Sequence, residues 1–271
     1  TFFINDSIKK KGKSDRIGWR LKRHAEKEFF RWMSTWSMMI KSPADLGFDG
    51  KQFILPKLNV KAHVLKSNPS EGSLFVEYAE TLPERREARK QSLDQRVELA
   101  KNIAQTKENC LIWCDYNNES DALHKAIPNS VEVKGSNTPE HKEKAMIGFS
   151  NNEVKYLVTK PSICGFGMNW QNCHDMIFCG LSDSYEQFYQ AIRRCYRFGQ
   201  KHEVNVHVII SEKEMNVLNN IKRKQADHER MSVEMVRVMS EGAKKELFGK
   251  DKKRTEYIPK INMEVPSWLP F

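Results

Sequence analysis

The sequence has no long hydrophobic run. None of its apolar stretches approaches the roughly 20 residues that a membrane-spanning helix needs. We therefore predict a protein without a membrane segment. The opening residues, TFFIND, contain neither an initiator methionine nor the apolar core of a signal peptide, so we expect the chain to be a fragment of a longer protein.

Paired cysteines are also missing: the chain has 6 cysteines but no CxxC pair. Cys173 and His174 with Cys179 are a grouping that would suggest zinc, but they stand in strand-like or motif contexts. We predict no metal site, six buried and reduced thiols, and a reducing, cytoplasmic compartment. The six are Cys110, Cys114, Cys164, Cys173, Cys179 and Cys195.

Two motifs that hold a nucleotide and its metal are absent as well. A phosphate-binding loop needs GxxxxGK followed by Ser or Thr. Gly12, Lys13 and Ser14 supply its end, but Ser7 stands at the place of the first glycine and lysines fill the middle. No DExH or DExD carboxylate pair is present to hold magnesium. The chain therefore lacks the residues that grip a nucleotide.

The charged residues that are present favour a globular protein with a polyanionic partner. Among 271 residues, 30% are charged and 39% are hydrophobic, and the net charge is +10. The excess is clustered in residues 9–16, with Arg20, Lys22 and Arg23 close behind, and in residues 250–254. Such basic runs are typical of solvated surface or of a nucleic-acid contact.

Short apolar runs alternate with helical patterns over the middle of the chain. VEV, YLV, MIF and VNVHVII are the expected core strands, and 58–66 is expected to be a further strand. This alternation predicts an α/β fold, with a parallel sheet and helices on both faces. Residues 80–107 are expected to be helical, and a long helix is expected beyond Ser211. The buried side expected within 80–107 consists of Leu93, Val97, Ala100, Ile103 and Ala104.

Residues 20–40 are predicted to form a helix with an apolar stripe. Its members recur at helical spacing, so we expect them in the core rather than on a base-stacking surface. They are Phe29, Trp32, Met33, Trp36 and Ile40. The final segment, EYIPKINMEVPSWLPF, is expected to dock on the body as an irregular tail.

The run QAIRRCYRFGQ contains the most informative spacing. Gln190, Arg194, Arg197 and Gln200 are separated by four, three and three residues, close to helical periodicity, which predicts that they share one helix face. Arginine presents a rigid fork of donors that matches phosphate oxygens. The run resembles the sixth motif, QxxxRxxRxGQ, of Swi/Snf-type superfamily-two helicases and translocases.

Three upstream blocks extend this resemblance in the same order. GFGMN, before the strand HDMIFCGL, is similar to the family's fifth motif, with a TKPSIC loop about two residues longer than in its chromatin-remodelling members. LIWC and the loop after it are similar to the fourth motif. Residues 131–152 resemble a strand, turn and helix in which Gly135 and Phe149 match and Lys142 replaces an arginine. The resemblance covers residues 107–212, and the sequence of these blocks is most similar to helicases of bacteriophages and prophages.

The resemblance implies a RecA-like C-terminal helicase lobe that acts on ATP held mainly, with Mg²⁺, by a missing first lobe. Arg197 and Arg194 would be the catalytic arginine fingers. The implied ATP-binding residues are Gln190, Gly165, Gly167 and Asn169. The implied nucleic-acid-binding residues are Thr159, Lys160, Asp115, Gly135 and Lys142. DNA, contacted through its backbone, and the N-terminal lobe of the same protein would be the partners, and this chain alone would be inactive.

The motifs also suggest a division of the chain. The segment 1–55 would end the first lobe, 56–106 would connect the lobes, 107–212 would form the RecA-like lobe, and 213–271 would contribute a brace helix and tail. An alternative stays open at this point. The chain would then be a non-enzymatic nucleic-acid-binding module with a degenerate RecA-like fold, although the intact arginines argue against degeneracy.

Overall fold

The computed structural model describes residues 2–5, 19–67, 78–165 and 167–248, in two compact units. Unit 2 is Gly50–Met231, and unit 1 combines Thr1–Asp49 with Ser232–Phe271. The strands are β1 (Phe3–Asn5), β2 (Trp19–Leu21), β3 (Leu58–Leu65), β4 (Cys110–Trp113), β5 (Ser130–Glu132), β6 (Tyr156–Thr159), β7 (Asp175–Cys179) and β8 (Val204–Ser211). The α-helices are α1 (Glu26–Met33), α2 (Leu82–Gln91), α3 (Leu93–Gln105), α4 (Asn117–Ala126), α5 (Pro139–Ser150), α6 (Pro161–Cys164), α7 (Tyr185–Ile192) and α8 (Met215–Phe248).

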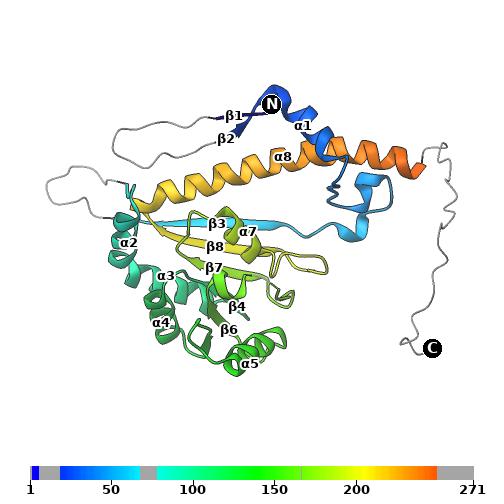
Figure 1. The fold of residues 1–271 in the computed structure, drawn as a ribbon. Coiled ribbons are helices and arrows are strands. Elements are labelled where there is room, and N and C mark those ends of the chain that lie inside the picture. Colours follow the sequence, from blue (N-terminus) through cyan, green and yellow to red (C-terminus); the bar gives the residue numbers. More distant parts are fainter. Residues whose placement is uncertain (1, 6–18, 68–77, 166, 249–271) are drawn as a thin grey trace, which may run out of the picture. The chain divides into compact units, whose positions relative to one another are not determined.

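Unit 2 is built on a six-stranded sheet with the order β3-β8-β7-β4-β6-β5 (Figure 1). Every neighbouring pair is parallel. Parallel strands need crossover connections, and the intervening helices supply them. The predicted α/β class is confirmed, and so are the strands expected from VEV, YLV, MIF, VNVHVII and 58–66.

Helices cover both faces of the sheet because alternate strand residues point to opposite sides. Leu111 and Trp113 of β4 lie in a core with side chains of α5, α7 and the start of α8. Cys110 and Ile112 lie in a second core with side chains of α3 and α4. The expected buried side of α3 is confirmed, since Val97, Ala100 and Ala104 are buried and Leu93 and Ile103 pack against that core.

The order of connections creates a switch point at the carboxyl edge of the sheet. β4 and β6 are neighbours. After β4 the chain enters α4 on one face of the sheet, and after β6 it enters α6 on the other face. The evidence is that Leu123 of α4 and Cys164 of α6 belong to opposite cores. In open α/β sheets, ligands bind outside the carboxyl ends of strands at such a point. The fold therefore brings the loops after β4, β5, β6 and β7 to one edge.

Unit 1 contains the antiparallel pair β1–β2, helix α1 and the C-terminal part of α8. The helix predicted over 20–40 is wrong in length, because α1 ends at Met33. The hydroxyls of Ser34 and Thr35 donate to the carbonyls of Arg31 and Trp32, which offers this segment an alternative to helical bonding.

The predicted core stripe of this segment is also wrong. Trp32 is 51% exposed and Trp36 is 63% exposed, and they pack edge to face on each other. Phe30, which lies beside the stripe, is the residue of α1 that is fully buried. Aromatic spacing therefore gave the periodicity of α1 but not the face that it buries.

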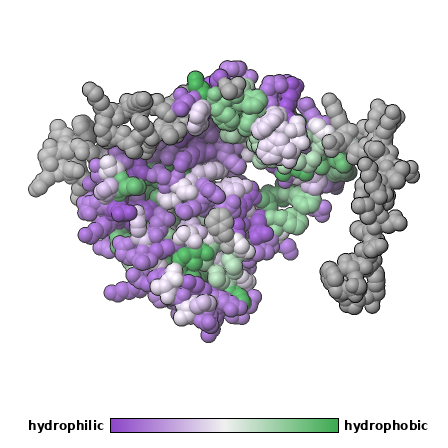
Figure 2. Space-filling model, in the orientation of Figure 1, coloured by the Kyte–Doolittle hydropathy of each residue, from purple (hydrophilic) through white to green (hydrophobic). Residues whose placement is uncertain are grey.

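The composition of the chain also led to predictions about its cysteines, membrane segments, metal sites and basic runs. All six cysteines are free and buried, as predicted. No described helix is long and apolar enough to cross a membrane, and no metal-ligating cluster occurs in the described part of the chain. The face in Figure 2 is mainly hydrophilic, with scattered hydrophobic patches. The Ser7–Ser14 stretch, the basic runs 9–16 and 250–254 and the C-terminal tail lie outside the described residues.

Candidate functional site

The two predicted catalytic arginines lie beyond the helix on which they were expected. Helix α7 starts at a Ser184 cap, which accepts a hydrogen bond from the Gln187 N–H, and it ends at Ile192. Arg194 and Arg197 therefore lie on the turns that follow, so the prediction of one continuous helix face is wrong after residue 192. Gly199 has φ of +93°, a left-handed conformation that glycine adopts without strain.

The turns nevertheless bring both guanidinium groups to one point. The carbonyl oxygen of Met168 accepts a hydrogen bond from Arg194 at 3.0 Å and another from Arg197 at 3.3 Å. Arg194 also donates to the carbonyl of Gln190 at 3.1 Å and to its side-chain oxygen at 3.4 Å. Arg194 is thus held by three acceptors, whereas the only hydrogen bond seen for the Arg197 guanidinium among the described residues is the one to Met168.

Among the described residues, no anion balances this arginine pair. Within the described part of the chain, no carboxylate forms an ion pair with either guanidinium. Burial, followed by repulsion from Arg197, lowers the pKa of Arg194 from its ordinary value. Arg194 is 8% exposed and Arg197 is partly exposed. Two adjacent, poorly solvated cations favour a bound anion, and the fork geometry fits phosphate oxygens.

Trp170 fixes the loop that meets the arginines. Its ring is fully buried and lies edge to face on Phe149 with centroids 5.4 Å apart. Its backbone N–H donates to the carbonyl of Arg194 at 2.9 Å. The motifs did not predict this role of Trp170, although a large aromatic residue next to a glycine-containing loop is a sequence signal of an anchor.

Three of the four predicted ATP-binding residues lie in the same loop, and the fourth, Gln190, lies on α7. Gly165 is buried, and a Cβ there would be 2.1 Å from the carbonyl oxygen of Pro161, so only glycine fits. Gly167 and Asn169 are exposed beside Met168. Gln190 contacts Arg194 as described. Gln200 instead turns inward, where its amide donates to the carbonyls of Gln171, Cys173 and Cys195, and this supports the turn.

The predicted nucleic-acid-binding residues gather separately, at the carboxyl edge. The Lys160 ammonium donates to the Asn117 side chain, and the Lys142 ammonium donates to the carbonyl of Gly135 at 2.7 Å. Gly135 is exposed. The Lys160 contact joins the segments that follow β4 and β6, whereas the Lys142 contact lies within the connection from β5 to α5.

Two further residues of this group, Thr159 and Asp115, also form contacts within the protein. Thr159 is fully buried, and its hydroxyl donates to the carbonyl of Val133 at 3.0 Å. Its side chain therefore supports the edge from beneath and, in this arrangement, does not reach a ligand. The Asp115 carboxylate pairs with Arg89 at 2.8 Å.

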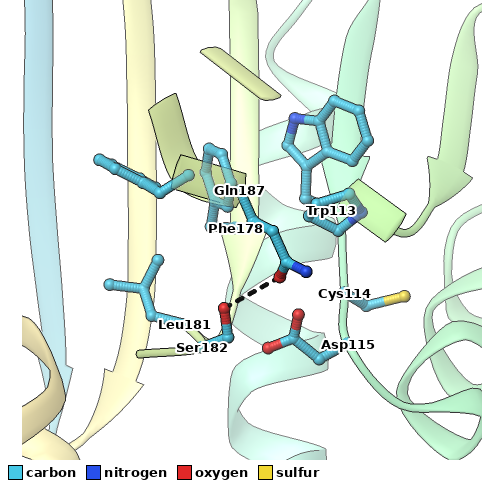
Figure 3. A pocket seen from close by; sticks show the side chains of 10 residues that line it. Trp113, Cys114, Asp115, Phe178, Leu181, Ser182 and Gln187 are labelled. Carbon is cyan, nitrogen blue, oxygen red and sulfur yellow. Dashed lines mark hydrogen bonds between the residues drawn. The ribbon is translucent and has the colours of Figure 1, made fainter. Parts of the chain in front are cut away.

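A small cavity lies between the ends of β4 and β7 (Figure 3). Trp113, Asp115, Phe178, Ser182 and Gln187 are among its lining residues, and Ser182 donates to Gln187 at 3.2 Å. The volume is about 10 Å³. Because one water molecule needs roughly 10–15 Å³, this cavity does not accommodate a nucleotide.

A buried ionic network supports the carboxyl edge, and sequence reasoning missed it. Arg96 is fully buried and donates to Glu119 at 2.8 Å and to the carbonyl of Cys179 at 2.7 Å. Arg89 is 5% exposed and pairs with Glu214 at 2.8 Å as well as with Asp115. Charged residues in an amphipathic helix usually indicate exposure, so their burial had no sequence signal.

Residues 93–199 match the family model described as "Helicase conserved C-terminal domain". The matched segment contains the site residues from Asp115 to Arg197. Together with the parallel sheet, this match confirms the RecA-like helicase C-terminal lobe as the fold. No curated protein matches the sequence.

Two solved structures show limited similarity. The C-terminal part of the Fun30 ATPase domain is 21% identical with a TM-score of 0.41, and the match covers 48% of this chain and 43% of that one. A DEAD box protein from the hyperthermophile Methanococcus jannaschii is 17% identical with a TM-score of 0.42, covering 48% of this chain and 37% of that one. The match thus spans less than half the length of either structure.

Proposed function

We propose that this chain is the second motor lobe of an ATP-dependent DNA helicase or translocase of the Swi/Snf-type superfamily-two class. The observation that carries the proposal is the convergence of Arg194 and Arg197 on the Met168 carbonyl, with no carboxylate partner among the described residues. This pair lies in the segment that matches the helicase C-terminal domain. A purely structural arginine pair would be expected to have an acidic partner, as Arg89 and Arg96 have.

Arg197 is the better candidate for the arginine finger. Within the described part of the chain its guanidinium donates to Met168 alone, whereas Arg194 is held by Gln190 and Met168 and so positions the loop. The γ-phosphate of ATP bound on a separate RecA-like lobe would accept hydrogen bonds from Arg197. Charge spreads over the phosphate oxygens in the transition state, and such a finger contributes about 10³–10⁵ in rate.

The first lobe would bind the β-phosphate and Mg²⁺, whose role is to neutralise the phosphate charge. Gly167 and Asn169, exposed beside the arginine pair, would line the ATP cleft from this side. The carboxyl edge would contact the nucleic-acid backbone through Lys160, Lys142 and the exposed turn at Gly135. Contacts to phosphates carry no base information, so we expect little sequence preference.

The ATPase activity of the chain alone tests the division of labour. We expect no phosphate release, with or without DNA, because the sequence contains no GxxxxGK loop followed by Ser or Thr and no DExH or DExD carboxylate pair to hold ATP and Mg²⁺. The protein that carries both lobes should hydrolyse ATP and be stimulated by DNA. Turnover that copurifies with the chain alone would contradict the proposal.

A further inference from the structure

An open pocket lies on the carboxyl side of the sheet. Its volume is about 390 Å³, and it lies between the outer part of α2 and the start of α4. The lining residues are Arg86, Arg89, Lys90, Tyr116, Asn118 and Glu119. All belong to unit 2. No family motif identified in the sequence includes the three basic residues of α2.

The floor of this pocket is rigid. The Arg89 guanidinium lies 5.1 Å from the centre of the Tyr116 ring, a cation–π distance. The same guanidinium is held by Glu214 and Asp115. Burial acts to lower the pKa of Arg89, but the neighbouring carboxylates outweigh it and raise the pKa above its ordinary value, so Arg89 stays protonated. The charge of the floor is therefore balanced inside the protein.

The rim of the pocket has an unbalanced positive charge. Arg86 and Lys90 are exposed and lie one turn apart on α2. Residues four apart on a helix face the same side. No carboxylate pairs with either side chain in the part of the chain that the structure describes. Asn118 adds an exposed amide, which can donate to phosphate or base oxygens.

The pocket lies next to the basic residues at the carboxyl edge of the sheet. Asn118 directly follows Asn117, whose side chain accepts a hydrogen bond from Lys160. The Lys160–Asn117 contact therefore brings a third cation close to the pocket that Arg86 and Lys90 border. A phosphodiester backbone fits a series of cations along an open surface, because each phosphate gains a counterion.

We infer that Arg86 and Lys90, above the Arg89–Tyr116 floor, form an additional backbone subsite for single-stranded nucleic acid. The inference rests on the proposed function, since it extends the nucleic-acid path of the same lobe. The phosphates would contact Arg86 and Lys90, and Asn118 would contribute a polar donor. This subsite lengthens the path without adding sequence preference.

The salt dependence of DNA binding by the whole chain tests the inference. Fluorescein-labelled oligothymidylate would be titrated at several salt concentrations by anisotropy. Each single-strand phosphate contact contributes about 0.7 to the slope of log affinity against log salt, so the double variant Arg86→Ala/Lys90→Ala should lower it by roughly 1.4. Both residues are exposed, and circular dichroism would verify the fold.

Lys125→Ala/Lys155→Ala is the matched control. It also removes two exposed cations, Lys125 in the last turn of α4 and Lys155 just before β6, both on the amino side of the sheet. It should change the slope less. Equal slopes for the two double variants, or no wild-type binding at low ionic strength, would overturn the inference. The proposed function would then still be supported if Arg197→Ala, in the protein that carries both lobes, lost DNA-stimulated ATP turnover.

Discussion

At the scale of single residues, the charged groups of this chain divide by whether they have a partner. Arg89 and Arg96 are buried and paired with Glu214, Asp115 and Glu119. Arg194 and Arg197 share a carbonyl acceptor and have no carboxylate among the described residues. Burying a guanidinium without a carboxylate partner is costly. The paired Arg89 and Arg96 therefore stabilise the fold, whereas Arg194 and Arg197 suit a transient anionic ligand.

The buried ion pair between Arg96 and Glu119 gives a prediction about stability. Arg96→Ala leaves the 1% exposed Glu119 without its closest cation, so we expect a loss of about 3–5 kcal/mol in unfolding free energy. Urea denaturation followed by circular dichroism measures it. Arg86→Ala, an exposed arginine on the adjoining helix, is the control and should change stability by less than about 0.5 kcal/mol. Similar unfolding midpoints for the two variants would contradict the structural role of Arg96.

At the scale of elements, the edge pair β3–β8 contains a titratable contact. His63 Nε2 and His207 Nδ1 are 3.0 Å apart, and the rings stack. Burial lowers the pKa of both histidines, with a further decrease from Lys61 for each and from His63 and Lys107 for His207. Asp175 acts on His207 in the opposite direction without reversing it.

This contact predicts a pH dependence of stability. The native histidines bind fewer protons than the unfolded ones below an ordinary pKa of about 6.5, so stability should fall as the pH falls through 6.5. The melting temperature between neutral and mildly acidic pH measures the effect. His207→Gln should flatten this dependence, whereas His24→Gln, in the separate unit 1, should not. A slope unaffected by His207→Gln would show that this pair is not the source.

Elements also show what the sequence could predict. The buried strands were predictable because each is a short apolar run between polar turns, as in YLVT of β6. The loop contacts were not, because a backbone acceptor such as the Met168 carbonyl has no side-chain signature. The spacing of Arg194 and Arg197 indicated their convergence, but it arises from turns after Ile192 rather than from a helix.

At the scale of the whole molecule, the predicted ligand contacts lie at two separate places on one lobe. The arginine pair contacts the loop before β7, and the basic residues follow the carboxyl edge of the sheet. A motor that couples ATP hydrolysis to movement along DNA needs such separation, since lobe closure on ATP can then shift the nucleic-acid contacts. In the proposed motor, the sheet would supply the rigid body for that coupling.

The most direct test replaces Arg197 in the protein that carries both lobes. Arg197→Ala should lower DNA-stimulated ATP turnover by about 10³-fold or more with nucleotide and DNA affinity nearly unchanged, because the finger acts mainly in the transition state. Arg197→Lys should rescue poorly, since an ammonium lacks the fork. Arg193→Ala is the control, because that guanidinium lies 5.0 Å and 5.3 Å from the rings of Tyr189 and Tyr196. Equal, undiminished turnover in both alanine variants would contradict the motor and favour the binding module.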